Sequence, residues 1–350
     1  MRSLITLLVL QIPFTVVADS PGVIVDQARL DRLHSTEMPK FERPISFDAS
    51  EADAILSALE VFPPDNPWNI PVDSWPVADN SAEMIELIGA EKQLRGNVDM
   101  AFVLVPPNQK KIDVKLSEYS TESDAGPYPV PENIPIEGWP AGFKRDPGTK
   151  SLTLDDVQRG KPTLDADRHA IVVDPVNRKL YEFYRLTKTD NGWNALQASI
   201  FDLSSNQLRP DGWTSSDAAG LPVFPAIVRY DELKRGKIEH ALRVTFKNTR
   251  RAYVYPATHF ASSKTDKNLP RMGERLRLRS SFDTSKFSPE VKVILEALKR
   301  YGMLTADNGI DWALSIAPDQ RIPVMHDELR KIKGYDFEVV VPPAGYQPPK

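Results

Sequence analysis

Cysteine is absent from this chain of 350 residues. Zinc–thiolate sites, thiol nucleophiles and disulfide bonds are therefore excluded, so a hydrophobic core must hold the fold together. Glycine is scarce compared with proline, at 17 residues against 31, which predicts stiff loops that lose little entropy on folding. No Gly-x-Gly-x-x-Gly, Gly-Lys-Ser/Thr, Gly-x-Ser-x-Gly or His-Glu-x-x-His string occurs. This argues against kinases, dinucleotide enzymes, the commonest serine hydrolases and zincins.

Long hydrophobic runs are also missing, except at the N-terminus. Met1-Arg2-Ser3 gives a basic start, Leu4–Val17 is almost wholly apolar, and Ala18 supplies a small residue at its end. This pattern predicts a signal peptide over residues 1–18. The run is shorter than the roughly 20 residues that a bilayer span needs, and Pro13 interrupts it. We expect a secreted or periplasmic protein with no membrane contact after cleavage; an uncleaved anchor is the alternative.

The chain has little excess charge of either sign. Its formal net charge is −4, and loss of the signal segment with its one arginine changes this to −5. A binder of phosphate backbones needs a basic surface, so nucleic acid is not expected as a partner.

Residues 19–62 are predicted to form an N-terminal arm with short helices. Ser50 begins an N-capped helix that ends before Pro63. A second short helix is expected over residues 81–88. Repeating strand–helix units are absent, which argues against a doubly wound sheet or a TIM barrel. We therefore expect residues 63–350 to form a single β-rich globular domain.

Segments with a strand pattern dominate the second half of the chain. The turn over residues 174–178 predicts a hairpin, and a second turn over residues 189–192 extends it to a three-stranded meander. One longer helix is expected, with Ser288 as its cap and Gly302 as its stop. The predicted fold is mainly β, a jelly-roll-like β-sandwich with a few short helices and one longer helix in the C-terminal half. The predicted strands are residues 101–105, 112–116, 169–173, 180–186, 193–203, 240–246, 253–255, 275–278, 313–316 and 337–341.

Several short strings occur together in a fixed order. With them the chain resembles a family of secreted bacterial proteins, over roughly Asp65 to Val340. The members of that family are uncharacterised, so the resemblance implies no catalytic residue. The strings are Asp167-Arg168-His169, the run 209–220 with Gly212-Trp213-Thr214, Glu239-His240-Ala241-Leu242-Arg243, Pro256-Ala257-Thr258-His259, and Tyr301-Gly302 followed by Ala306-Asp307-Asn308-Gly309.

Three of the five histidines open or close a predicted strand: His169, His240 and His259. A buried histidine needs a polar partner, and one held by a carboxylate makes a general base. Alternation along the strand places His240 and Arg243 on opposite faces. We take His240 and His259 as catalytic candidates and His169 as a substrate-binding candidate. The structural alternative is that each ring binds a nearby backbone carbonyl.

Three carboxylates are catalytic candidates. Glu182 lies between Tyr181 and Phe183, where desolvation raises the pKa of a carboxyl group, as a glycosidase acid requires. An ion pair with an arginine is the alternative. Asp217 lies in a loop of small residues that could line a cleft, and Asp307 belongs to an Asp-Asn-Gly string that also suits a tight turn. Glu182 or Asp217 would be the acid and Asp307 its partner.

Aromatic and basic side chains complete the expected site. Trp213 and Tyr255 could stack on sugar rings, although large aromatic residues more often belong to the core. Arg168 and Arg243 could neutralise a substrate carboxylate. Metal binding has weak support because no His-x-His spacing occurs; a structural calcium at the turn over residues 190–192 is the cofactor left open.

The favoured function is a secreted glycoside hydrolase that acts on extracellular polysaccharide or oligosaccharide. A polysaccharide lyase is the first alternative, with His240 or His259 and Tyr255 abstracting a proton. A non-catalytic carbohydrate-binding or cell-surface protein is the second. All three depend on the fold bringing the scarce ionisable residues into one cleft.

Overall fold

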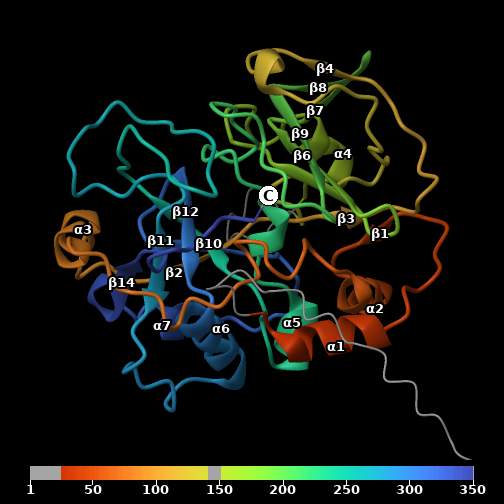
Figure 1. The fold of residues 1–350 in the computed structure, drawn as a ribbon. Coiled ribbons are helices and arrows are strands. Elements are labelled where there is room, and N and C mark those ends of the chain that lie inside the picture. Colours follow the sequence, from red (N-terminus) through yellow and green to blue (C-terminus); the bar gives the residue numbers. More distant parts are fainter. Residues whose placement is uncertain (1–24, 141–150, 350) are drawn as a thin grey trace, which may run out of the picture.

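The computed structural model describes residues 25–140 and 151–349, which form three β-sheets joined by short helices (Figure 1). The expected signal peptide, residues 1–18, lies outside the described residues. Within the described ranges, no helix has both the length and the apolar character needed to cross a membrane. The helices are α1 (Gln27–Ser35), α2 (Ser50–Ala58), α3 (Ser81–Ile88), α4 (Leu154–Gln158), α5 (Tyr230–Arg235), α6 (Pro289–Arg300) and α7 (His326–Leu329), with 3₁₀ turns η1 (Ser120–Glu122), η3 (Phe224–Ala226) and η4 (Gly334–Asp336).

The three sheets differ in size and position. Sheets A and C lie at the upper right of Figure 1, and sheet B lies at the left. In spatial order, sheet A is β1 (Ile45–Ser46), β3 (Val103–Leu104), β5 (Ala170–Asp174), β6 (Lys179–Tyr184) and β9 (Gln197–Asp202); sheet B is β14 (Phe337–Val340), β11 (Arg275–Leu278), β12 (Met303–Asn308), β10 (Leu242–Phe246), β13 (Ala313–Ile316) and β2 (Arg95–Val98); sheet C is β4 (Val114–Leu116), β8 (Gly192–Ala195) and β7 (Thr187–Thr189).

The hairpin predicted around residues 174–178 is present. β5 and β6 pair antiparallel, with Val172 opposite Tyr181, and the side chain of Asp174 accepts the backbone N–H of Asn177 within the turn. β9 then pairs with β6, which gives the expected meander. Between them, β7 and β8 leave the meander and join β4 in sheet C.

Pairing elsewhere departs from the expected pattern in three ways. The pairs β10–β12, β2–β13, β3–β5 and β4–β8 are parallel, whereas a jelly roll is built from antiparallel strands. The strand expected over residues 253–255 is reduced to one bridge between Tyr253 and Met272. Asp307, expected in a tight turn, belongs to β12. The fold is sheet-rich, as predicted, but its strand order is more complex than sequence patterning indicates.

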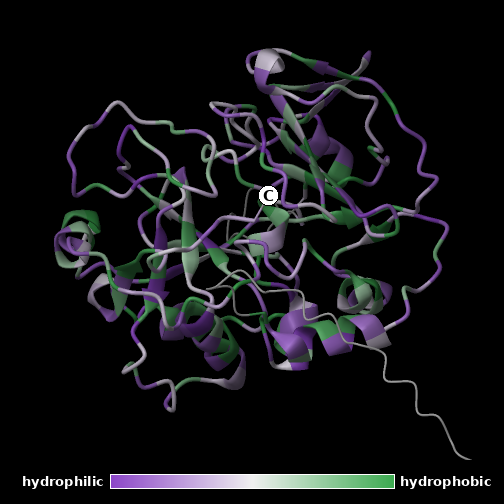
Figure 2. Cartoon of the chain, in the orientation of Figure 1, coloured by the Kyte–Doolittle hydropathy of each residue, from purple (hydrophilic) through white to green (hydrophobic). Residues whose placement is uncertain are grey.

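The core lies on both faces of sheet A. Alternation along β5 sends Ile171 and Val173 into a large cluster shared with sheet B, while Val172 joins a smaller cluster with sheet C. This explains why β5 is an unbroken apolar segment. Figure 2 shows the same contrast across the molecule, with hydrophobic residues on the central strands and hydrophilic residues along the outer loops.

Helix α6 matches the sequence expectation. Pro289 occupies its first turn, and Val291, Ile294 and Leu298 are fully buried at helical spacing. The side chain of Ser288 makes no capping hydrogen bond, so proline and the apolar face define this helix.

The N-terminal arm is part of the folded body. β1 pairs with β3 at the edge of sheet A, and Ile45 and Phe47 enter the large core cluster. The side chain of Arg32 on α1 donates to the carbonyl of Ser57 on α2 at 2.8 Å. The segment predicted as an N-terminal arm with short helices therefore supplies two helices and an edge strand of sheet A.

Candidate functional site

Asp217 and Arg243 are the centre of a buried polar cluster that links sheet A to sheet B. Arg243 on β10 donates its Nε to Asp217 Oδ2 at 2.8 Å and its Nη2 to Asp217 Oδ1. Its Nη1 donates to the hydroxyl of Ser315 on β13 at 2.6 Å. Burial alone would lower the pKa of Arg243, but the Asp217 carboxylate outweighs it and raises that pKa. The guanidinium is therefore a permanent positive charge between the sheets.

Asp307 lies next to this ion pair, at the end of β12. It is half-buried, whereas Asp217 is fully buried. Burial, followed by the charge of Asp217 and a hydrogen bond to it, raises the pKa of Asp307 well above the ordinary carboxyl value. A carboxyl group that stays protonated beside an ionised one can serve as a proton donor.

Glu182 holds the loop that carries Asp217. Its carboxylate accepts the backbone N–H groups of Val223, at 2.9 Å, and Phe224, at 2.8 Å, and the hydroxyl of Ser216 at 3.1 Å. Burial raises the pKa of Glu182 to about 7, although these hydrogen bonds oppose the shift. With 0% of its surface exposed, Glu182 cannot touch a substrate in this conformation. We assign it a positioning role in place of the acid role expected from the sequence.

His169 completes what we call the acid cluster: His169, Glu182, Asp217, Arg243 and Asp307. The imidazole is 4% exposed, and its Nδ1 has no hydrogen-bond partner among the described residues. Burial lowers the pKa of His169, which keeps the ring neutral. A buried polar atom without a partner is a place where a ligand group or an ordered water can bind.

The loop beside the acid cluster depends on one glycine. Gly220 has a φ of +73°, and a side chain there would meet the carbonyl of Trp213 at 2.6 Å. The loop is then tied to β12, because Ala219 donates its N–H to the carbonyl of Ala306 at 2.9 Å. This bond places the loop beside Asp307.

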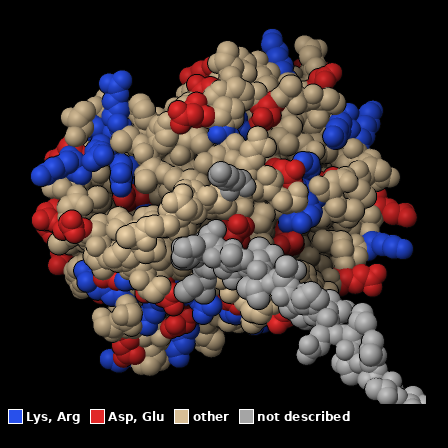
Figure 3. Space-filling model, viewed as in Figure 1, with Lys and Arg blue, Asp and Glu red and all other residues tan. Residues whose placement is uncertain are grey.

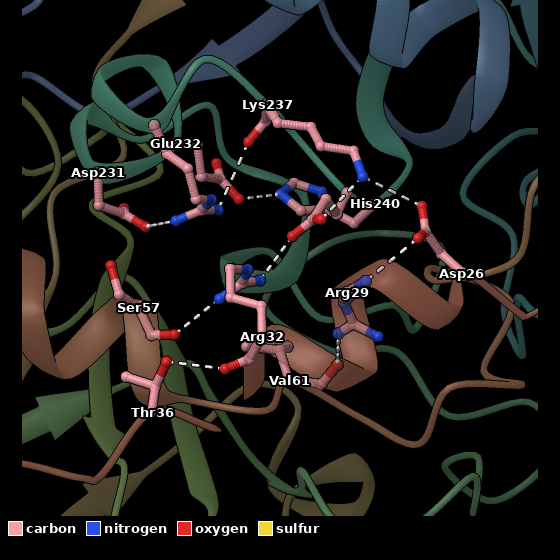
Figure 4. A network of polar contacts seen from close by, with 12 residues as sticks. Asp26, Arg29, Arg32, Thr36, Ser57, Val61, Asp231, Glu232, Lys237 and His240 are labelled. Carbon is pink, nitrogen blue, oxygen red and sulfur yellow. Dashed lines mark hydrogen bonds and ion pairs between the residues drawn. The ribbon is translucent and has the colours of Figure 1, made fainter. Parts of the chain in front are cut away.

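The two other histidine candidates do not join the acid cluster. His259 is half-buried and its Nδ1 contacts the carbonyl of Ala218 at 2.7 Å, which is the structural alternative considered for it. It lies on the rim of the cluster. His240 contacts Glu232 on α5 through Nε2 at 2.7 Å and the carbonyl of Ala241 through Nδ1 at 2.8 Å. Figure 4 shows His240 in a separate network with α1 and α5. This corrects the expectation that His240 belongs to the same site as Asp307.

The remaining candidates are dispersed. Arg168 donates to backbone carbonyls, among them that of Val157 at 2.8 Å, and not to a member of the acid cluster. Trp213 is half-buried under the guanidinium of Arg209, 5.5 Å from the ring centre. Tyr255 lines a separate pocket of about 250 Å³ together with Trp75. These positions do not support the substrate-binding roles expected for them at the acid cluster.

Three residues near the cluster were missed. Ser216 and Ser315 bind Glu182 and Arg243, and Asp99, fully buried after β2, acts electrostatically on His169 and Arg243. Ser315 is the one hydroxyl of the apolar strand β13, which is a signal the sequence contains. Among the described residues, no group of three or more His, Asp or Glu side chains is placed to hold a metal ion.

Four members of the acid cluster come from the short strings noted in the sequence: His169, Asp217, Arg243 and Asp307. Other residues of the same strings, among them Arg168 and His240, lie elsewhere. Comparison with family models, with curated proteins and with solved structures gives no match for the chain. The site must therefore be interpreted from its own chemistry.

Proposed function

We propose that the chain is an exported glycoside hydrolase that uses Asp307 as its general acid. The observation that carries this is the raised pKa of a half-buried Asp307 beside the fully buried ion pair of Asp217 and Arg243. Asp307 would donate a proton to the glycosidic oxygen as that C–O bond breaks, and water would add to the sugar carbon. The proton that this water releases would pass through solvent and reprotonate Asp307. Asp217 does not reach solvent, and its negative charge helps to raise the pKa of Asp307, which favours the protonated form of Asp307. The apolar segment over residues 4–17 supports export and, with the resemblance, a secreted protein family.

A row of aromatic rings beside Asp307 supports carbohydrate as the ligand. His259 and Phe260 are parallel, with ring centres 5.9 Å apart, and Tyr253 continues the row at 6.2 Å. The segment is fixed next to β12, because Asn308 donates its side-chain N–H to the carbonyl of Ala261 at 2.6 Å. Flat, partly exposed aromatic surfaces suit the C–H faces of sugar rings.

The same segment is strongly basic, which favours an acidic polysaccharide. Residues 247–271, between β10 and β11, contain six lysines and arginines and one aspartate. Basic side chains gather over this loop at the upper left of Figure 3, whereas the rest of the visible face mixes both signs. Such a surface attracts and orients substrates that carry carboxylates.

We further propose that sheets A and B pack as a β-sandwich around the acid cluster. The large core cluster draws side chains from both sheets, such as Ile171 from β5 and Val244 from β10. In that arrangement Glu182 and Arg243 face each other across the loop of Asp217, which would fix the acid by contacts from both sides.

Two alternative functions are each supported by a specific observation. The basic loop and His259 fit a polysaccharide lyase, in which a base removes a proton next to a neutralised substrate carboxylate. The complete burial of Glu182 and Asp217 fits a carbohydrate-binding protein whose ion pairs only stabilise the fold.

Product analysis with Asp307→Asn separates these functions. Wild type is incubated with acidic and neutral polysaccharides, and reducing ends and the absorbance of unsaturated products are measured. We expect reducing ends without unsaturated products, and a rate about 10²–10⁴-fold lower for Asp307→Asn. Asp327→Asn, a change at an exposed residue of α7 outside the basic loop, is the matched control and should keep the rate. A full rate in Asp307→Asn would exclude this acid, unsaturated products would indicate a lyase, and binding without products would indicate a lectin-like protein.

A further inference from the structure

A second polar cluster, which shares no residue with the acid cluster, connects the N-terminal arm to the body (Figure 4). We call it the arm network. Arg32 on α1 pairs with Glu239 at 2.5 Å, and Arg229 beside α5 pairs with Glu232 at 2.6 Å. The arm network consists of Asp26, Arg29, Arg32, Arg229, Asp231, Glu232, Arg235, Lys237, Glu239 and His240.

A small cavity lies inside the arm network. The space within it is about 30 Å³, and its lining includes residues from α1, α2, α5 and the segment before β10. A single ordered water needs roughly 10–15 Å³ of the same kind of space, so the cavity can hold one or two waters or one small ion. It is too small for a phosphate or a sugar.

The lining of the cavity has more positive than negative charge. Four arginines face two glutamates: Arg29, Arg32, Arg229 and Arg235 against Glu232 and Glu239. Asp231 pairs with Arg229 and Arg235, but it does not line the cavity. An arginine does not lose its proton in a protein, so this excess cannot be relieved by titration of the guanidinium groups.

Three of these arginines also have unsatisfied donors. Arg32 Nε, Arg229 Nη1 and Arg235 Nε are buried and have no hydrogen-bond partner within the described part of the chain. Arg229 is only 6% exposed, so bulk water does not solvate its free donor. Buried guanidinium N–H groups without an acceptor are costly, and one anion could accept from all three.

We propose that the cavity is a binding site for one monoatomic anion, chloride under physiological conditions. The ion accepts hydrogen bonds from the arginines of the arm and of α5, and it compensates their excess charge. Because the arginines come from separate segments, a bound chloride would fasten α1 to α5. The site is independent of the acid cluster and of the proposed hydrolase activity.

Thermal unfolding of the full chain tests the site in solution. Sodium chloride is titrated against sodium gluconate at constant ionic strength, so that general screening does not change. We expect a saturable rise of Tm with chloride, by about 2 °C at a tenfold excess over the dissociation constant. Bromide supplies a second readout, because its anomalous scattering should give one peak inside the cavity of a crystal.

Conservative variants identify the donors. Arg235→Lys keeps the charge but removes Nε, and it should weaken the chloride-dependent rise at least threefold in apparent affinity. Arg279→Lys, at a half-exposed ion pair with Glu338, is the control and should leave the rise unchanged. Absence of both the saturable rise and the bromide peak overturns the proposal and assigns the cavity to water. A bromide peak without any saturable effect shows binding at crystal concentration only and also overturns it.

Discussion

The acid cluster and the arm network are both buried and polar, but they have opposite charge imbalances. The acid cluster contains three carboxyl groups, Glu182, Asp217 and Asp307, and one guanidinium, that of Arg243, which pairs with Asp217. In the arm network, four cavity-lining arginines face two glutamates. An excess of carboxylates can be relieved by a proton, and the raised pKa of Asp307 indicates that it is. An excess of arginines cannot be relieved by a proton, and we propose that an anion compensates it.

The two regions therefore respond to pH with opposite signs. Burial raises the pKa of Glu182 to about 7, so this group binds a proton more tightly in the folded state, and its contribution to stability falls as pH rises from about 4 to 7. In the arm network, burial is outweighed by Arg229 and His240, which lower the pKa of Glu232 to about 2. That contribution is present above about pH 4.5 and is lost as pH falls toward 2. Asp231 is an exception, since burial raises its pKa despite Arg229.

The largest effect should come from removing Arg243, the only cation within the described ranges that contacts Asp217. Arg243→Met leaves Asp217 fully buried without a counter-charge, so we expect a loss of about 3–5 kcal/mol in the free energy of unfolding. Urea unfolding at pH 7 measures this change in the free energy of unfolding. Arg279→Met, at the partly exposed pair with Glu338, should cost less than about 1 kcal/mol. If Arg243→Met costs no more than this control, the acid cluster does not depend on its cation.

Removing a carboxylate from the arm network should destabilise the protein. Glu239 pairs with Arg32 at 2.5 Å and with Lys237 at 3.0 Å, so Glu239→Gln increases the cation excess. We expect a loss of about 1–3 kcal/mol, because Arg32 keeps partial access to solvent. The loss should be larger in gluconate than in chloride if an anion compensates the arginines. An equal loss of stability in both salts would mean that Glu239 acts through its ion pairs alone, and it would contradict a role of a bound anion in compensating the arginines.

Removing a carboxylate from the acid cluster should have the opposite sign. Asp307→Asn deletes a group whose folded-state pKa is raised by burial and by Asp217. The variant should be as stable as wild type near pH 3, where the group is protonated in both states, and should become more stable than wild type as pH rises to 7, by at least about 1–2 kcal/mol. Urea unfolding at several pH values between these limits would show it. A variant that is less stable at pH 7 than at pH 3, relative to wild type, would mean that Asp307 is ionised in the folded protein.

Local sequence patterns predict the elements better than the sites. The hairpin of β5 and β6 and helix α6 follow from turn residues and apolar spacing, which act over a few positions. The parallel pairing of β10 with β12 joins segments about 60 residues apart, and no periodicity encodes that choice. Asp307 therefore looked like a turn residue, although the parallel pairing places it at the end of a central strand.

The members of the acid cluster were predictable as rare polar residues within apolar segments, and Glu182 is the clearest case. The roles of these residues were not predictable, because each role depends on which residues of other strands and loops contact the side chain. Glu182 receives two backbone N–H groups from η3 and the segment before it, which makes it a positioning residue. His240 and Arg243 were expected on opposite faces of one strand and were assigned to one site. His240 lies before β10 begins at Leu242, so strand alternation does not set its direction; it contacts Glu232, whereas Arg243 pairs with Asp217.

The smallest effect is expected at His240, and it tests the separation of the two clusters directly. Its two ring nitrogens contact Glu232 and the carbonyl of Ala241, and neither contacts a member of the acid cluster. In His240→Gln the side-chain amide can still donate to Glu232, so we expect a change below about 1 kcal/mol in the free energy of unfolding. Hydrolysis and its pH profile should be unchanged, in contrast to Asp307→Asn. A large drop in rate with normal stability would place His240 in the reaction and would require a conformation that joins the two clusters.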